Sequence, residues 1–263
     1  MAPPDTAARL PAPPPLSDDC ALFLDVDGCL LEFADDPSSV RADASLLASL
    51  EAASRRLGGA LALVSGRSVA SLDSIFAPSL FAAAGLHGLE RRDHPGGQAM
   101  GEVEQAALDA TRWSDVVAEA RARLAGHAGA RVEDKGRTLA LHWRAAPPAE
   151  DASRGFAAWA LPRLPGYVLQ PGSNVLELRP AGADKGAAIA AFLGLPPFAG
   201  RRPVFAGDDL TDEHGFALVN ARAGISIVVG DRRPTQARHG LADPAALRRW
   251  LGHSTHHHRE ASA

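Results

Sequence analysis

The stretch ALFLDVDGCLLEF, residues 21–33, closes an apolar run with two aspartates and a glycine. Residues 21–24 have the composition of a buried strand, and Asp25, Asp27 and Gly28 come directly after it. Two carboxylates placed this close repel each other, and burial raises the free energy of each charge. A strand that ends in this way indicates a site that uses its acids for chemistry.

Four segments of the chain share this pattern of an apolar run that ends in small and polar residues and is followed by a helical pattern. They lie at 21–28, 59–68, 79–90 and 201–213, and residues 223–230 add a fifth short strand. We expect helices over 43–57 and 184–194, and the second has apolar residues at helical spacing and a capping aspartate. Strands and helices in alternation predict an α/β fold with a Rossmann-like parallel sheet that is covered on both faces.

Residues 100–180 have a different pattern, with an amphipathic helix over 102–125 and strand-like stretches over 131–144 and 167–180. The turn PGSN at 171–174 divides the last stretch into a predicted hairpin. We therefore expect an α+β domain, residues 100–180, inserted into a core domain of residues 19–99 and 181–252. The Pro-rich residues 1–18 and the tail 253–263 are expected to be disordered.

The composition argues against nucleic-acid and membrane partners. A formal net charge of -4 and a pI near 6.2 supply no basic field to attract polyanions or anionic lipid. No apolar run reaches transmembrane length, and the first residues lack the apolar segment of a secretory signal. The two cysteines fit a reducing compartment, so we expect a cytoplasmic protein, and the oligomeric state stays open.

Polar residues follow each predicted strand, and ligands of open parallel sheets bind outside the carboxyl ends of the strands. Asp25 and Asp27 project in the same direction, while Asp208 and Asp209 follow another strand. Such a group of carboxylates cannot stay ionised without a cation, and a partly open shell of oxygen ligands favours Mg2+. The other polar residues expected at this edge are Ser65, Gly66, Arg67, His87 and Glu90.

Lys185 begins a predicted helix and adds a positive charge near the helix N-terminus. Together with the hydroxyl of Ser65, it predicts a phosphate site. Carboxylates, Mg2+, a hydroxyl and an ammonium group suit phosphoryl transfer. An EF-hand calcium loop that begins at Asp25 does not fit, because its sixth position is Leu30 instead of glycine and its twelfth is Asp36 instead of glutamate.

The order of these motifs resembles that of the haloacid dehalogenase (HAD) superfamily of phosphohydrolases. DVDGCL (25–30), VSGRS (64–68), Lys185 in GADKG (182–186) and GDDLTDE (207–213) match its four motifs. Within that superfamily the chain resembles the trehalose-6-phosphate phosphatase branch. Four stretches carry this resemblance: GLHGLE (85–90), VEDKGRTLALHWR (132–144), VLELRP (175–180) and FAGDDLTDEHGF (205–216). The resemblance covers most of residues 20–250, and it implies a HAD core whose inserted α+β domain is a type 2 cap.

The resemblance also implies an activity, the Mg2+-dependent hydrolysis of trehalose 6-phosphate through an aspartyl-phosphate. Asp25 would be the nucleophile, and Asp27 would protonate the leaving sugar oxygen and then take a proton from water. Ser65 and Lys185 would hold the transferred phosphoryl group. The implied Mg2+ ligands are the Asp25 side chain, the Asp27 carbonyl and Asp208, with Asp209 and Asp212 supporting the water shell.

In the cap, Glu133, Lys135 and Glu177 match the family positions that face the sugar. Arg67 and its neighbour Gly66 in the second motif are also expected to reach the substrate. His87 and Glu90 are expected near the site in an orienting role. The predicted partner is therefore a small-molecule sugar phosphate, without nucleic acid or membrane.

Two other functions remain open at this point. The first is a HAD phosphatase for a different sugar phosphate, such as sucrose phosphate or mannosylglycerate phosphate. The second is a non-catalytic sugar-phosphate sensor or phospho-acceptor module. Asp27 and the inserted domain disfavour an acceptor module, since a mere acceptor needs no acid and a receiver domain has no room for the insertion.

Overall fold

The computed structural model describes residues 10–33, 40–76, 80–97, 100–101, 110–172 and 174–253. The chain divides into two compact units, one made of residues 1–102 and 184–263 and the other of residues 103–183. The sequence patterns place the boundaries of the insertion at 100 and 180, slightly earlier in the chain. The two units are described separately.

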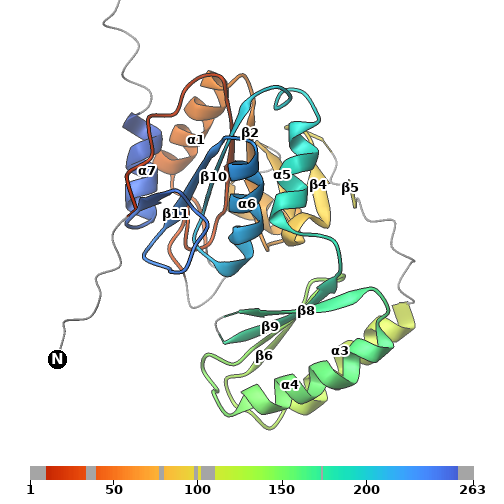
Figure 1. Ribbon diagram of the computed structural model, residues 1–263. Helices are drawn as coiled ribbons and strands as arrows, with labels where there is room; N and C mark the ends of the chain where they lie inside the picture. Colours follow the sequence, from red (N-terminus) through yellow and green to blue (C-terminus); the bar gives the residue numbers. More distant parts are fainter. Residues whose placement is uncertain are drawn as a thin grey trace, which may run out of the picture. The chain divides into compact units, whose positions relative to one another are not determined.

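An eight-stranded sheet with the order β12-β11-β10-β1-β2-β3-β4-β5 forms the first unit (Figure 1). The strands from β12 to β3 pair in parallel, and antiparallel pairing begins at β4. This arrangement confirms the predicted parallel α/β sheet. The strand bounds are β1 Cys20–Leu24, β2 Leu61–Val64, β3 Ala82–Gly85, β4 Glu90–Arg92, β5 Met100–Gly101, β10 Arg202–Gly207, β11 Ile225–Val229 and β12 His239–Leu241.

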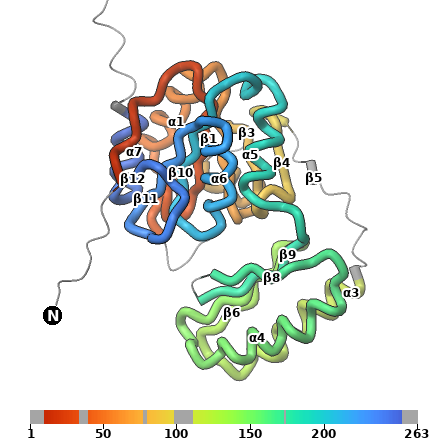
Figure 2. Tube along the Cα trace, in the orientation of Figure 1, coloured from red at the N-terminus to blue at the C-terminus, as the bar shows by residue number. Residues whose placement is uncertain are grey.

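Helices cover both faces of this sheet. α1 packs with α7, and α5 packs with α6 (Figure 2). From β1 the chain passes through α1 to β2 on one side, whereas from β10 it passes through α6 to β11 on the other side. Because crossovers between parallel strands are right-handed, α1 and α6 lie on opposite faces of the sheet. The helix bounds are α1 Ala44–Arg56, α2 Val69–Phe76, α5 Lys185–Leu193, α6 Glu213–Ala221 and α7 Pro244–His253, with short 3-10 helices η2 Leu86–Gly88 and η4 Leu210–Asp212.

The helices predicted over 43–57 and 184–194 are both present. Asp43 caps α1 by accepting a hydrogen bond from Leu46 N at 2.8 Å, and Asp184 caps α5 by accepting one from Ala187 N at 2.8 Å. Each carboxylate satisfies a backbone N–H that has no partner within its helix. The cap at Asp184 fixes where α5 begins, and so it fixes the place of Lys185.

The central strand β1 is buried along its whole length. The ring of Phe23 lies against two other buried rings, with centroid distances of 6.0 Å to Phe192 and 5.5 Å to Phe198. Burying each such side chain stabilises the fold by roughly 1.5–3 kcal/mol. The residues that follow β1 are therefore carried on a rigid support.

The second unit is a four-stranded antiparallel sheet of order β6-β7-β9-β8 with two helices on one face (Figure 1). The predicted hairpin is confirmed, since β8 pairs with β9 around a turn whose residue 173 lies outside the described residues. Of the helix predicted over 102–125, residues 102–109 lie outside the described residues and α3 occupies the rest. The bounds are α3 Ala110–Leu124, β6 Arg131–Asp134, β7 Leu139–His142, α4 Ala149–Ala160, η3 Leu161–Arg163, β8 Tyr167–Gly172 and β9 Val175–Pro180.

The expectation of disorder over residues 1–18 is wrong for residues 10–18. Backbone carbonyls of this segment accept hydrogen bonds from Gly240 N, Trp250 Nε1 and Arg56 Nη2, at 2.9–3.0 Å. Leu16 is buried in the core of the first unit. The proline-rich composition hid these contacts because extended backbone can be held by partners far away in the sequence. Residues 1–9 and 254–263 of the predicted disordered ends lie outside the described residues.

None of the helices in the described parts of the chain has both the length and the hydropathy that are needed to cross a bilayer.

Candidate active site

Three neighbouring strands deliver the predicted site residues to one edge of the sheet. Asp25 follows β1, Ser65 follows β2 and Asp208 follows β10, and β1 lies between the other two strands. The sheet therefore brings together residues that are far apart in the sequence, at the edge where ligands of parallel sheets bind. Lys185 joins them from the first turn of α5.

Lys185 bridges two buried carboxylates. Its Nζ lies 2.8 Å from Oδ1 of Asp25 and 2.6 Å from Oδ1 of Asp212, and all three side chains are buried. Although burial acts in the opposite direction, the two carboxylates raise the pKa of the Lys185 ammonium above its ordinary value. Lys185 therefore keeps its positive charge at the centre of the site.

Asp25, Asp208 and Asp212 form an acidic group in which one carboxylate oxygen from each residue lies within 4.8 Å of the other two. Burial and the neighbouring carboxylates raise the pKa of Asp25 to about 7 and that of Asp208 to about 9, against the pull of Lys185. Oδ1 of Asp208 is buried and accepts no hydrogen bond from the described residues. Excess negative charge and an unsatisfied buried oxygen fit a divalent cation with oxygen ligands.

Gly28 makes room for this group. Its φ of +78° is a left-handed conformation, and a Cβ at this position would lie 2.2 Å from Oδ2 of Asp208. A side chain here would displace the Asp208 carboxylate, so the glycine of the first motif is required for packing as well as for its backbone conformation.

Asp212 has both of its oxygens occupied. Oδ1 binds Lys185, and Oδ2 accepts hydrogen bonds from the backbone N–H groups of Asp208 and Asp209, each at 2.9 Å. Asp209 itself is exposed and accepts a hydrogen bond from Leu210 N at 2.7 Å. Asp212 thus fixes the loop that carries Asp208, whereas Asp209 caps the short helix η4.

Asp27 is bound by an arginine from the second motif. Nε of Arg67 donates a hydrogen bond to Oδ2 of Asp27, and Nη2 donates one to Oδ1, each at 2.7 Å. The two side chains therefore form a bidentate ion pair. The guanidinium of Arg67, which was expected to reach the substrate, is therefore engaged with the expected general acid.

Ser65 is buried, and its Oγ accepts a hydrogen bond from Arg67 N at 3.2 Å. Gly66 lies between them, directly under the ring of His87. Oε2 of Glu90 accepts a hydrogen bond from Val69 N at 2.8 Å, at the start of α2. His87 and Glu90 thus contact the loop that carries Ser65, which places them beside the predicted phosphate-binding residues.

In the second unit, Glu133 and Glu177 each pair with Ala140, so both lie on the same face of its sheet. This face is opposite to the one that carries Leu139, Leu141 and Leu178 against the helices. Nζ of Lys135 lies 3.3 Å from Oε1 of Glu177. The three predicted sugar-binding residues are therefore grouped on the face of the sheet that the helices do not cover.

One contact at this face was missed from the sequence. Nε2 of His142 lies 3.0 Å from Oε2 of Glu133, and this hydrogen bond lowers the pKa of the Glu133 carboxyl. In the pairing of β6 with β7, Arg131 lies opposite His142 and Glu133 lies opposite Ala140. Side chains two residues apart in a strand share a face, so His142 is a diagonal neighbour of Glu133. The alternating pattern of the two strands was the signal for this contact.

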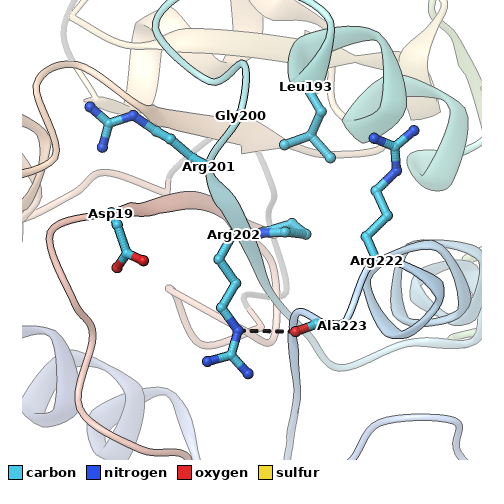
Figure 3. A pocket seen from close by; sticks show the side chains of 8 residues that line it. Asp19, Leu193, Gly200, Arg201, Arg202, Arg222 and Ala223 are labelled. Atoms are coloured by element: carbon cyan, nitrogen blue, oxygen red, sulfur yellow. Dashed lines mark hydrogen bonds between the residues drawn. The ribbon is translucent and has the colours of Figure 1, made fainter.

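A cavity of about 530 Å3 lies at the opposite edge of the first unit's sheet, where β1 and β10 begin (Figure 3). Its lining includes Arg201, Arg202 and Arg222, whose guanidinium groups point away from one another. Nε of Arg201 and Nε of Arg202 donate to the carbonyls of Pro197 and Ala223 at 2.8 and 3.0 Å. This cavity contains none of the acidic residues described above, so it is separate from the candidate active site.

Comparison with known proteins gives results that agree with this geometry. The family model described as trehalose-phosphatase matches residues 23–245. A probable trehalose-phosphate phosphatase of Sinorhizobium fredii is 46% identical over 233 residues, which cover 88% of this chain and 86% of the relative. The trehalose-6-phosphate phosphatase of Escherichia coli is 41% identical over 238 residues, which cover 90% of this chain and 87% of the relative.

Solved structures with the same fold extend the comparison. A trehalose-6-phosphate phosphatase related protein superposes with a TM-score of 0.74 at 26% identity, over 88% of this chain and 95% of that one. The C-terminal domain of the C. albicans trehalose-6-phosphate phosphatase gives a TM-score of 0.76 at 21% identity, over 95% of this chain and 99% of that one. The family model and the two bacterial relatives span most of the chain, and the chain therefore belongs to the trehalose-phosphatase family of the HAD superfamily.

Proposed function

We propose that this chain is a Mg2+-dependent phosphatase that hydrolyses trehalose 6-phosphate to trehalose and inorganic phosphate, in trehalose biosynthesis. The observation that carries the proposal is the close grouping of Asp25, Lys185, Asp208 and Asp212 in a chain that is 41–46% identical to named trehalose-phosphate phosphatases. An ammonium group and three carboxylates at one sheet edge suit phosphoryl transfer, where positioning and charge neutralisation dominate.

Mg2+ would be held by the side chain of Asp25, the backbone carbonyl of Asp27 and the side chain of Asp208, with Asp209 and Asp212 in support. The raised pKa values of Asp25 and Asp208 and the unsatisfied Oδ1 of Asp208 support this assignment. When bound, Mg2+ would supply positive charge that keeps these carboxylates ionised and offsets the charge of the phosphate.

Asp25 is the proposed nucleophile. Its carboxylate oxygen would form a bond to phosphorus while the bond from phosphorus to the sugar oxygen breaks, which leaves an aspartyl-phosphate. Lys185, held 2.8 Å from Asp25, would keep a positive charge beside the phosphoryl oxygens, and the hydroxyl of Ser65 would donate a hydrogen bond to them.

Asp27 is the proposed general acid and base. It would give its proton to the sugar oxygen as that oxygen leaves. It would then take a proton from the water that attacks phosphorus and releases Asp25, so that the second step returns the proton spent in the first. The ion pair with Arg67 supports a defined position for this carboxyl group in the absence of substrate.

Glu133, Lys135 and Glu177 are the proposed sugar-binding residues. They bring acceptor oxygens and a donor ammonium to one sheet face, and hydroxyl groups of a sugar require both kinds of partner. In the first unit, Gly66 and Arg67 are proposed to contact the substrate beside the phosphate-binding Ser65.

The decisive experiment measures phosphate release from trehalose 6-phosphate with Mg2+ and with EDTA. Release that requires Mg2+ is expected. A parallel panel with sucrose phosphate and mannosylglycerate phosphate tests the sugar, because equal turnover of all three would remove the trehalose assignment. Binding of trehalose 6-phosphate without any phosphate release would indicate a sensor instead of an enzyme.

A further inference from the structure

The segment from Gly85 to Glu90 makes an unusual turn immediately after β3. Leu86 and His87 have φ values of 49° and 56°, so two consecutive residues with large side chains occupy the left-handed region. Both are buried. Left-handed backbone at such residues is unfavourable, and it persists where the surrounding contacts determine it.

The turn holds the loop that carries Ser65. Leu86 N donates a hydrogen bond to Arg67 O at 2.9 Å, and His87 N donates one to Ser65 O at 3.0 Å. The ring of His87 covers Gly66 so closely that a Cβ at Gly66 would lie 2.8 Å from both Cε1 and Nε2 of His87. The left-handed conformation is thus what directs these two N–H groups and the ring onto one loop.

The same segment reaches the helices on either side of the site. The carboxylate of Glu90 accepts a hydrogen bond from Val69 N, the first residue of α2. The short helix η2 packs against α5, whose first residue is Lys185. The segment therefore touches both parts of the proposed phosphate site, the loop with Ser65 and the helix with Lys185.

We propose that residues 85–90 form a positioning turn that sets the separation of these two parts, with His87 and Glu90 as its positioning residues. The inference rests on the proposed function, since it concerns the phosphate site of that function. His87 acts through Gly66, and Glu90 acts through the N-terminus of α2. Neither residue is a catalytic residue in this proposal.

The first test is a double-mutant cycle that uses inorganic phosphate as the probe. Phosphate affinity is measured by calorimetry in the presence of Mg2+ for Gly66→Ala, His87→Asn and the double variant. Asparagine tolerates the left-handed backbone and lacks the ring atoms that cover Gly66. Gly66→Ala alone is expected to weaken phosphate binding about 10-fold, because a displacement of a few tenths of an ångström at the loop misplaces its donors.

In the His87→Asn background, the same Gly66→Ala change is expected to weaken binding by no more than about 2-fold, because the ring that it would strike is absent. An equal loss in both backgrounds would overturn the assignment of His87. Failure of the unaltered protein to bind phosphate would also overturn the proposal.

The second test concerns Glu90 and is matched by a control far along the sheet. Glu90→Ala removes the acceptor for Val69 N and is expected to weaken phosphate binding about 10-fold, whereas Glu90→Gln keeps an acceptor oxygen and should remain within about 2-fold. Asp243→Ala removes an equivalent acceptor, for Ala246 N at the start of α7 beyond the edge strand β12. It should lower the melting temperature without changing phosphate affinity.

Equal effects of Glu90→Ala and Asp243→Ala on phosphate affinity would show a purely structural role and overturn the proposal. Phosphate affinity is read without turnover. If the wild-type protein releases no phosphate but the variants show the expected changes in phosphate affinity, only the proposed function is contradicted. If the wild-type protein is active but the variants do not show these changes in affinity, only the positioning turn is contradicted.

Discussion

Arg67 and Asp27 are joined by two hydrogen bonds of 2.7 Å, from Nε and Nη2 of the guanidinium to the two carboxylate oxygens. Both oxygens are therefore used as acceptors. The ion pair fixes the orientation of the Asp27 carboxyl group, and each of its oxygens keeps a second lone pair. The second motif thus orients the residue of the first motif that is proposed as the acid.

Arg67→Lys is expected to lower kcat at least about 10-fold, because lysine cannot bind both oxygens in the fixed geometry of a guanidinium and the acid loses its orientation. Steady-state phosphate release measures the effect. Arg55→Lys is the matched control, since Arg55 makes an exposed ion pair with Glu51 on α1. Unchanged kcat in Arg67→Lys would show that the ion pair has no part in turnover.

Asp25→Asn is expected to reduce phosphate release to the level without enzyme, because an amide cannot attack phosphorus. Asp27→Asn should slow release by about 100-fold or more, in line with the usual contribution of general acid–base catalysis. Phosphate release under saturating substrate checks both variants. Turnover like that of the wild type in Asp25→Asn would disprove the nucleophile assignment.

The stabilisation by Mg2+ is expected to depend on pH. The pKa of Asp25 is raised to about 7 and that of Asp208 to about 9 without a cation, so their protonated forms favour the folded state. Their contribution to stability is present at low pH and is lost as pH rises through these values. Mg2+ replaces the protons, so its effect should grow with pH.

Melting temperatures with and without Mg2+ at about pH 6 and about pH 8 provide the measurement, and the increase on adding Mg2+ should be larger at the higher pH. Asp208→Asn is the control, because it removes one of the titrating carboxylates and should reduce the difference. Equal increases at both pH values would contradict the expectation.

Asp212→Ala is expected to lower the free energy of unfolding by about 3 kcal/mol or more, because it leaves the buried ammonium of Lys185 with one carboxylate fewer and two backbone N–H groups without an acceptor. Urea denaturation measures the loss. Asp209→Ala, at an exposed carboxylate that caps the short helix η4, should cost about 1 kcal/mol. Similar losses in the two variants would refute a central role for Asp212.

Glu177→Ala is expected to raise KM for trehalose 6-phosphate about 10-fold, since one buried acceptor for the sugar is lost. Hydrolysis of p-nitrophenyl phosphate, which has no sugar, should change little. Glu150→Ala removes an exposed carboxylate on α4 of the same unit and serves as the control. A parallel loss with both substrates would point to a general defect instead of sugar recognition.

Sequence patterns were sufficient for the elements with strong local signals. The apolar run before Asp25 predicted β1, and the capping aspartate at 184 predicted the start of α5 at Lys185. The alternation of strands and helices predicted the parallel sheet, and that sheet places Asp25, Ser65 and Asp208 at one edge. Elements with weaker signals, such as α4 and the short strands β4 and β12, were not predicted.

The contacts between distant side chains depended on the tertiary structure. Nothing in the spacing of the motifs indicated that Arg67 would bind Asp27, 40 residues away. The left-handed turn at Leu86 and His87 was likewise hidden, because each residue by itself prefers another conformation. Local backbone preferences and hydrophobic periodicity act over a few residues and can be read along the chain. Ion pairs and strained turns form only when packing brings their partners together and holds them there.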